Sequence, residues 1–167
     1  MKNQIHLITY KHRNKHAVID TNLLLVYLVG CIDTQLIATF KRTNSRYRVE
    51  DFKILDDLVS KFDNIVTTPN ILTEVSNLGG QLDKKKKPLF FSLLSQFIDR
   101  AKEIYIQSSE ISKDDLFIKL GITDRGLFEL DKSKYIIISD DYKLCSYCNN
   151  KGLYSINFNH ARDYVNY

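Results

Sequence analysis

The chain has 167 residues, of which 44% are hydrophobic and 26% charged, and its net charge is +4 at pH 7. These values are typical of a globular domain and exclude an intrinsically disordered chain. The longest apolar run, 23–32, is too short to span a bilayer, which needs roughly 20 apolar residues. Three cysteines and the lack of an apolar leader near the N-terminus lead us to expect a cytoplasmic protein with no membrane association.

We expect one domain over residues 1–167, with a basic N-terminal arm at 1–15, because no stretch has the composition of a linker. Short runs of apolar or β-branched residues predict strands at 17–20, 64–68, 134–140 and 154–158. Apolar residues at helical spacing predict helices at 22–32, 49–62, 69–80, 88–104, 121–130 and 142–152. This alternation favours an α/β domain with a mainly parallel sheet.

Acidic residues stand at the ends of two predicted strands. Asp20 ends the first strand, and Asp140 and Asp141 follow the strand rich in isoleucine. Ligands of parallel α/β sheets bind outside the carboxyl ends of the strands, so we expect these acids to meet there if the strands are neighbours. Glu74 and Asp124 share predicted helix faces with apolar residues, which is unusual for solvated acids.

Each of these acids also has a purely structural interpretation. Asp20 and Asp124 suit the N-termini of helices, and Asp140 and Asp141 suit a turn. Grouped together, however, carboxylates about 4 Å apart repel by roughly 1 kcal/mol per pair in water and about 4 kcal/mol at an effective dielectric of 20. A divalent ion relieves this repulsion, and oxygen ligands favour Mg²⁺ or Mn²⁺ over zinc. We therefore expect a metal site formed by Asp20, Glu74, Asp124, Asp140 and Asp141.

Four segments, in this order, resemble the motifs of the PIN-domain ribonucleases, a family related to the toxin ribonucleases of toxin–antitoxin pairs. They are VIDTNLLL (18–25), TTPNILTEVSNL (67–78), GITDRGLFEL (121–130) and IIISDDYKL (136–144). The resemblance implies a three-layer α/β/α sandwich around the parallel sheet. It also implies a catalytic quartet made of Asp20, Glu74, Asp124 and Asp141.

Three further residues take their expected roles from the same motifs. Ser139 fills the Thr/Ser position of the fourth motif, so that Asp141 matches the family's acid and Asp140 becomes an additional carboxylate. Asn22 matches the family's asparagine, which implies that it supports Asp20 or a bound phosphate.

The function implied by the resemblance is a Mg²⁺- or Mn²⁺-dependent endoribonuclease. Hydrolysis in which the ribose 2′-hydroxyl takes no part leaves 5′-phosphate and 3′-hydroxyl ends. RNA is then the substrate, and the family also implies an inhibitory antitoxin-like protein and a homodimer as partners.

Two alternative functions stay open. The first is a Mg²⁺-dependent phosphatase with an aspartate nucleophile, of the haloacid dehalogenase type, although its second aspartate is replaced here by Asn22 and it gives Glu74 no role. The second is a non-catalytic nucleic-acid-binding module on the same fold.

Basic residues crowd into two segments that we expect to contact RNA, and a solvated loop is the alternative for each. The predicted contacts are Lys41, Arg42, Arg46, Arg48, Lys84, Lys85, Lys86 and Lys87. Phe40 and Tyr47, which lie among these charges, suit either stacking on bases or packing in the core. The pair Cys145 and Cys148 is typical of core packing rather than of a zinc site, since no second pair exists.

Overall fold

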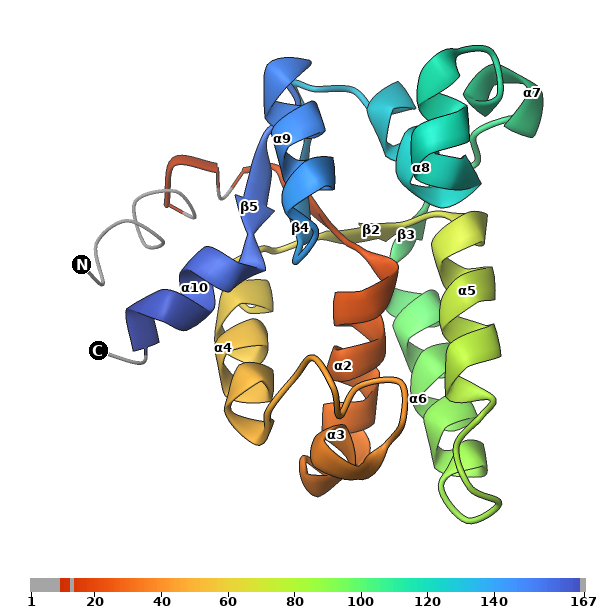
Figure 1. Ribbon diagram of the computed structural model, residues 1–167, viewed down its shortest axis with the longest axis vertical. Coiled ribbons are helices and arrows are strands. Elements are labelled where there is room, and N and C mark those ends of the chain that lie inside the picture. The colour runs from red at the N-terminus through yellow and green to blue at the C-terminus, as the bar shows by residue number, and fades with distance from the viewer. Residues whose placement is uncertain (1–9, 13, 166–167) are drawn as a thin grey trace.

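The computed structural model describes residues 10–12 and 14–165, and within them five strands form one sheet in the order β3-β2-β1-β4-β5 (Figure 1). All four pairings are parallel. The strands are β1 (His16–Ile19), β2 (Ile65–Thr67), β3 (Lys102–Glu103), β4 (Tyr135–Ser139) and β5 (Ser155–Asn157). The predicted α/β class with a parallel sheet is therefore confirmed.

Helices cover both faces of the sheet (Figure 1). On one side lie α2 (Thr21–Ile32), α3 (Gln35–Thr39), α4 (Val49–Val59), α5 (Pro69–Gly79) and α6 (Lys87–Arg100). On the other side lie α7 (Ser108–Ile111), α8 (Asp115–Gly126) and α9 (Tyr142–Asn150). A short 3₁₀ helix (Leu127–Glu129) follows α8, and α10 (Phe158–Val165) packs against α4. The arrangement is the expected three-layer sandwich.

The order of the strands reverses between β1 and β4, and parallel α/β sheets have a crevice at the carboxyl ends of the strands at such a position. The chain runs from β1 outward through β2 to β3, then returns to β4 and runs outward through β5 in the opposite direction. At such a reversal the connections leaving the two neighbouring strands diverge, and the carboxyl ends of the strands border a ligand site. Asp20 and Asp140 follow β1 and β4 directly, so both stand at this reversal.

Helix α2 is buried almost all round because it packs against α4, α5 and α6 as well as the sheet. The close packing of α5 against α6 depends on Gly79, because a Cβ added there would stand only 2.0 Å from the ring of Phe90. The buried side chains of β4, Ile136, Ile137 and Ile138, complete the core on the sheet side.

Several predicted element boundaries were wrong. The helix predicted at 88–104 ends at Arg100, because 102–103 pair with β2 as the edge strand β3. The helix predicted at 121–130 starts where expected, because Gly121 (φ 73°, ψ −178°) separates it from an unpredicted helical segment that begins at Asp115, but it ends earlier, at Gly126. The helices α3, α7 and α10 were not predicted.

The basic N-terminal arm predicted at 1–15 falls largely outside the described residues, which omit 1–9 and 13. Its described part packs against the domain. The ring of His12 lies 4.2 Å from that of Tyr154, and Lys15 Nζ donates to the carbonyl of Lys132 at 3.0 Å. Within 10–12 and 14–165, no helix has the length and apolar character that crossing a membrane requires.

Candidate functional site

Asp20 is buried at the end of β1, with 5% of the residue exposed, and it caps α2. Its Oδ1 accepts the N–H of Leu23 at 2.9 Å, and its Oδ2 accepts the hydroxyl of Ser139. The Ser139 oxygen in turn accepts the N–H of Asp141 at 3.0 Å. The helix-cap interpretation of Asp20 is therefore correct, and the carboxylate is also fixed from the end of β4.

The carboxyl group of Asp20 is unusually hard to ionise. Burial raises its pKa to about 7, and repulsion from Asp140 and, to a smaller extent, Asp124 adds to the rise. The hydrogen bonds from Ser139 and Leu23 oppose it. No lysine or arginine of the described chain forms an ion pair with Asp20.

Glu74 connects three of the four motif segments. Its Oε2 accepts the hydroxyl of Thr21 at 2.9 Å, and its Oε1 accepts the hydroxyl of Thr123 at 2.6 Å. These threonines are the sequence neighbours of Asp20 and Asp124. The expectation that Glu74 lies on a buried apolar face was wrong, because the residue is exposed.

Asp124 and Asp141 complete the group on the other side of the crevice. Burial raises the pKa of Asp124 to about 6, and repulsion from Asp141 and Glu74 contributes. Asp141 is exposed and caps α9, with Oδ1 accepting the N–H groups of Lys143 at 2.7 Å and Leu144 at 3.1 Å. All the acids expected at the site thus belong to one electrostatically coupled group.

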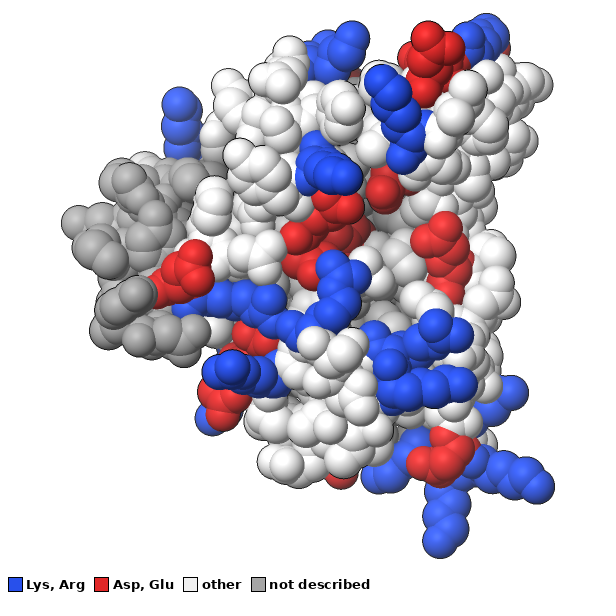
Figure 2. All heavy atoms as spheres, in the orientation of Figure 1, with Lys and Arg blue, Asp and Glu red and all other residues white. Residues whose placement is uncertain are grey.

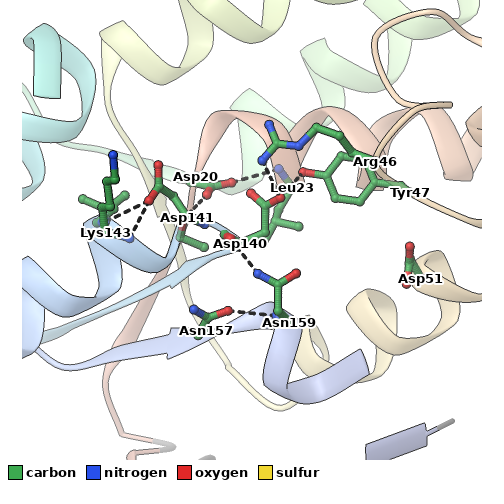
Figure 3. A network of polar contacts seen from close by, with 12 residues as sticks. Asp20, Leu23, Arg46, Tyr47, Asp51, Asp140, Asp141, Lys143, Asn157 and Asn159 are labelled. Carbon is green, nitrogen blue, oxygen red and sulfur yellow. Dashed lines mark hydrogen bonds and ion pairs between the residues drawn. The ribbon is translucent and has the colours of Figure 1, made fainter. Parts of the chain in front are cut away.

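Asp140, the additional carboxylate, is buried, with 7% of the residue exposed. Its Oδ2 accepts the hydroxyl of Tyr47 at 2.8 Å and pairs with Arg46 at 3.0 Å (Figure 3). Its Oδ1 is buried without a hydrogen-bond partner among the described residues. After burial, repulsion from Asp140 is the strongest cause of the raised pKa of Asp20.

Arg46 and Tyr47 belong to the loop between α3 and α4, and α10 holds this loop in place. Arg162 donates to the carbonyl of Arg46 at 2.6 Å and to Asp51, and its guanidinium lies 5.2 Å from the centre of the Tyr47 ring. Asn159 donates to the carbonyl of Asp140 at 2.7 Å. The core interpretation of Tyr47 is confirmed, since 3% of the residue is exposed.

Sequence reasoning missed the residues that orient the acids. Thr21 and Thr123 are part of the motifs Asp-Thr-Asn and Gly-Ile-Thr-Asp, so their place beside the acids was a usable signal. Tyr47 and Arg162 carry no such local signal. The side chain of Asn22, expected to support Asp20, is half-buried and has no hydrogen-bond partner in the described part of the chain.

The predicted RNA-contacting residues lie at different distances from the acids. Figure 2 shows the acidic side chains gathered near the middle of one face, with basic side chains bordering them. Arg46, half-exposed, is in direct contact with Asp140. Lys84–Lys87 lie at the turn joining α5 and α6, at the end of α5 remote from the sheet (Figure 1). Lys41, Arg42 and Arg48 are exposed, and Arg42 donates to Gln81 at 2.8 Å.

The donor set fits a hard divalent cation, although the side chains do not form a closed cage. Among residues 10–12 and 14–165, no three His, Cys, Asp or Glu side chains converge closely enough to hold a metal ion as they stand. The buried, unpartnered Oδ1 of Asp140 and the oriented carboxylate of Asp20 are oxygen donors of the kind that Mg²⁺ and Mn²⁺ prefer.

Comparison of the chain with protein-family models, with curated proteins and with solved structures gave no match. The geometry of the site is therefore the basis for its interpretation.

Proposed function

We propose that this protein is a PIN-like endoribonuclease that depends on Mg²⁺ or Mn²⁺ and leaves 5′-phosphate and 3′-hydroxyl ends. The observation that carries the proposal is the bridge formed by Glu74, whose two oxygens accept the hydroxyls of Thr21 and Thr123. This bridge draws three separate segments to the strand ends where Asp140 and Asp141 also lie. Such a concentration of carboxylates is costly without a cation.

The acids expected to hold the metal are Asp20, Glu74, Asp124, Asp140 and Asp141. Once bound, Mg²⁺ or Mn²⁺ supplies a Lewis acid for the phosphodiester and lowers the pKa of a water molecule. Ser139 keeps the carboxylate of Asp20 aimed at the crevice, and the two threonines do the same for Glu74. Both roles are orienting ones.

Arg46 provides positive charge at the mouth of the crevice. One of its nitrogens pairs with Asp140, and half of its side chain is exposed. The exposed part of a guanidinium offers further N–H donors that suit a phosphate. We assign it to holding the RNA backbone beside the acids, together with Lys41, Arg42 and Arg48 of the same loop and, for longer RNA, Lys84–Lys87.

The phosphatase alternative has less support. A phosphatase of this type uses a second aspartate two residues after its nucleophile, and Asn22 stands at that position. This alternative also leaves the bridge through Glu74 without a role.

Cleavage of end-labelled RNA tests the proposal. We expect the wild type to cut in Mg²⁺ or Mn²⁺ and not in EDTA, and Asp20→Asn to be inactive while still binding RNA. The exposed, remote Asp57→Asn variant is the matched control and retains activity. Products that end in 2′,3′-cyclic phosphate, or full activity of Asp20→Asn, would refute the mechanism.

A further inference from the structure

A groove of about 590 Å³ lies between α8 and α9. It is lined by Lys119 and Leu120 of α8 and by Tyr142, Lys143 and Tyr147 of α9. Sites for small ligands typically have volumes of roughly 300–1,000 Å³. The groove is therefore large enough for a bound ligand. None of the roles proposed for the acid cluster (Asp20, Glu74, Asp124, Asp140 and Asp141) involves it.

Both walls of the groove lead to the acid cluster. Tyr142 is the first residue of α9 and directly follows Asp141, which caps that helix. On the other wall, α8 continues past the break at Gly121 to Asp124. One acid of the site is therefore the immediate neighbour of a lining residue on α9, and another lies on the same helix as the lining residues of α8.

The charge of the groove suits a polyanion. Lys119 and Lys143 are exposed, and neither forms an ion pair with a described residue. No acidic side chain is among the residues that line the groove. Two unneutralised cations on facing walls attract a phosphate backbone that runs between them.

An exposed aromatic ring supplies the second kind of contact. Tyr142 is 70% exposed, and no aromatic or cationic partner in the described residues covers its ring. Nucleic-acid bases stack on such rings. Stacking needs an exposed base face, and unpaired nucleotides offer one whereas stacked bases inside a duplex do not.

We propose that this groove binds unpaired RNA nucleotides next to the bond that is cut, with one base stacked on Tyr142 and the backbone between Lys119 and Lys143. The inference rests on the proposed function and narrows its substrate to single-stranded RNA or loops. It also places the groove, like Arg46, nearer to the reaction than the remote turn at Lys84–Lys87.

Fluorescence anisotropy in EDTA, where cleavage is not expected, tests the groove on the intact protein. The probe is a short fluorescein-labelled RNA of mixed sequence, used single-stranded and annealed to its complement. We expect the single strand to bind more tightly, and Tyr142→Ala to weaken its binding roughly tenfold, within the range for one stacked base. Tyr142→Phe, which keeps the ring, binds as the wild type does. Lys119→Ser with Lys143→Ser weakens binding and lowers its salt dependence.

Matched variants separate the groove from general surface effects. Tyr105 is 76% exposed and lies outside the groove, so Tyr105→Ala leaves binding unchanged. Lys53→Ser with Lys151→Ser removes the same charge elsewhere and has a smaller effect than the groove pair. Equal losses in the groove and control variants, wild-type binding by Tyr142→Ala, or no RNA binding at all would overturn the inference.

Cleavage assays with the same RNA in Mn²⁺ distinguish the two proposals. Loss of cleavage in Asp20→Asn together with unaltered binding and cleavage in Tyr142→Ala overturns the groove alone. Binding that depends on Tyr142 in a wild-type protein that cuts no RNA overturns the nuclease proposal alone.

Discussion

The hydroxyl of Ser139 donates a hydrogen bond to the carboxylate of Asp20 across the two central strands of the sheet. Because the same oxygen accepts the N–H of Asp141, this one side chain links the ends of β1 and β4. It therefore determines the direction in which the buried acid faces.

We expect Ser139→Ala to reduce RNA cleavage by roughly 10–100-fold, which is the usual cost of losing a group that orients a metal ligand. Ser139→Thr keeps the hydroxyl and retains most of the activity. Initial cleavage rates at several Mn²⁺ concentrations measure the effect, and equal rates for Ser139→Ala and the wild type would contradict the orienting role.

Asp20 makes the stability of the metal-free protein depend on pH. Its pKa rises from 3.8 to about 7 on folding, so the folded chain holds this proton more tightly, by about 4 kcal/mol. This stabilisation is complete below about pH 4 and is lost as the pH rises to about 7. We expect the advantage of Asp20→Asn over the wild type to grow across this window. Urea unfolding in EDTA at a series of pH values measures the difference, and parallel stability curves would contradict the prediction.

Divalent ions are expected to reverse this loss. Asp20 and Asp124 must lose their protons before they bind metal, so Mn²⁺ should raise the melting temperature at pH 8 far more than at pH 5. An ion present at about 100 times its Kd adds about 2.7 kcal/mol. Thermal unfolding with and without Mn²⁺ provides the measurement. Asp20→Asn should lose most of the shift and Asp57→Asn none of it; equal shifts in both variants would argue against a metal site.

The buried contact between Tyr47 and Asp140 makes a separate prediction. Tyr47→Phe removes a hydroxyl that donates to Oδ2 of Asp140 at 2.8 Å and leaves Arg46 as the side-chain partner of that oxygen. Leaving a buried acceptor short of a partner costs about 1–3 kcal/mol. Chemical denaturation measures this loss. Tyr105→Phe, at an exposed position, is the control and should change stability little; a similar loss there would show that the Asp140 contact is not the cause.

The contact between α5 and α6 depends on the absence of a side chain at Gly79. A Cβ at this position would lie 2.0 Å from the Phe90 ring, so Gly79→Ala forces the two helices apart. Overpacking of this kind typically costs about 1–3 kcal/mol. The cost should be smaller in a Phe90→Leu background, because leucine lacks the outer ring atoms that lie nearest to the added Cβ. A double-mutant cycle measured by urea unfolding checks the coupling, and additive effects would show that the two residues do not clash.

The elements predicted correctly have local signals in the sequence. Thr68 caps α5 by accepting the N–H of Ile71, and Pro69 opens the helix, as their types indicate. The isoleucine run of β4 is buried throughout. By contrast, β3 consists of Lys102 and Glu103, which become a strand only through pairing with β2, so no apolar pattern marks it.

The candidate site was likewise predictable only in part. A carboxylate after each of two neighbouring parallel strands predicts the meeting of Asp20 and Asp140, because the sheet brings those ends together. The contact of Tyr47 with Asp140 joins positions 93 apart, and nothing in the basic loop distinguishes a tyrosine that packs inward from one that stacks on RNA. The exposure of Glu74 depends on which other elements cover that side of α5, and helical periodicity does not predict this.

The anchoring of the site by α10 bears on when the protein becomes competent during its synthesis. Asp20 and Glu74 precede Asp140, Asn159 and Arg162 in the sequence, so they are translated first. A nascent chain thus carries these two acids apart from their partners until α10 has been made and docks on the loop that holds Arg46. If the acids cut RNA, the message being translated is spared until α10 has left the ribosome.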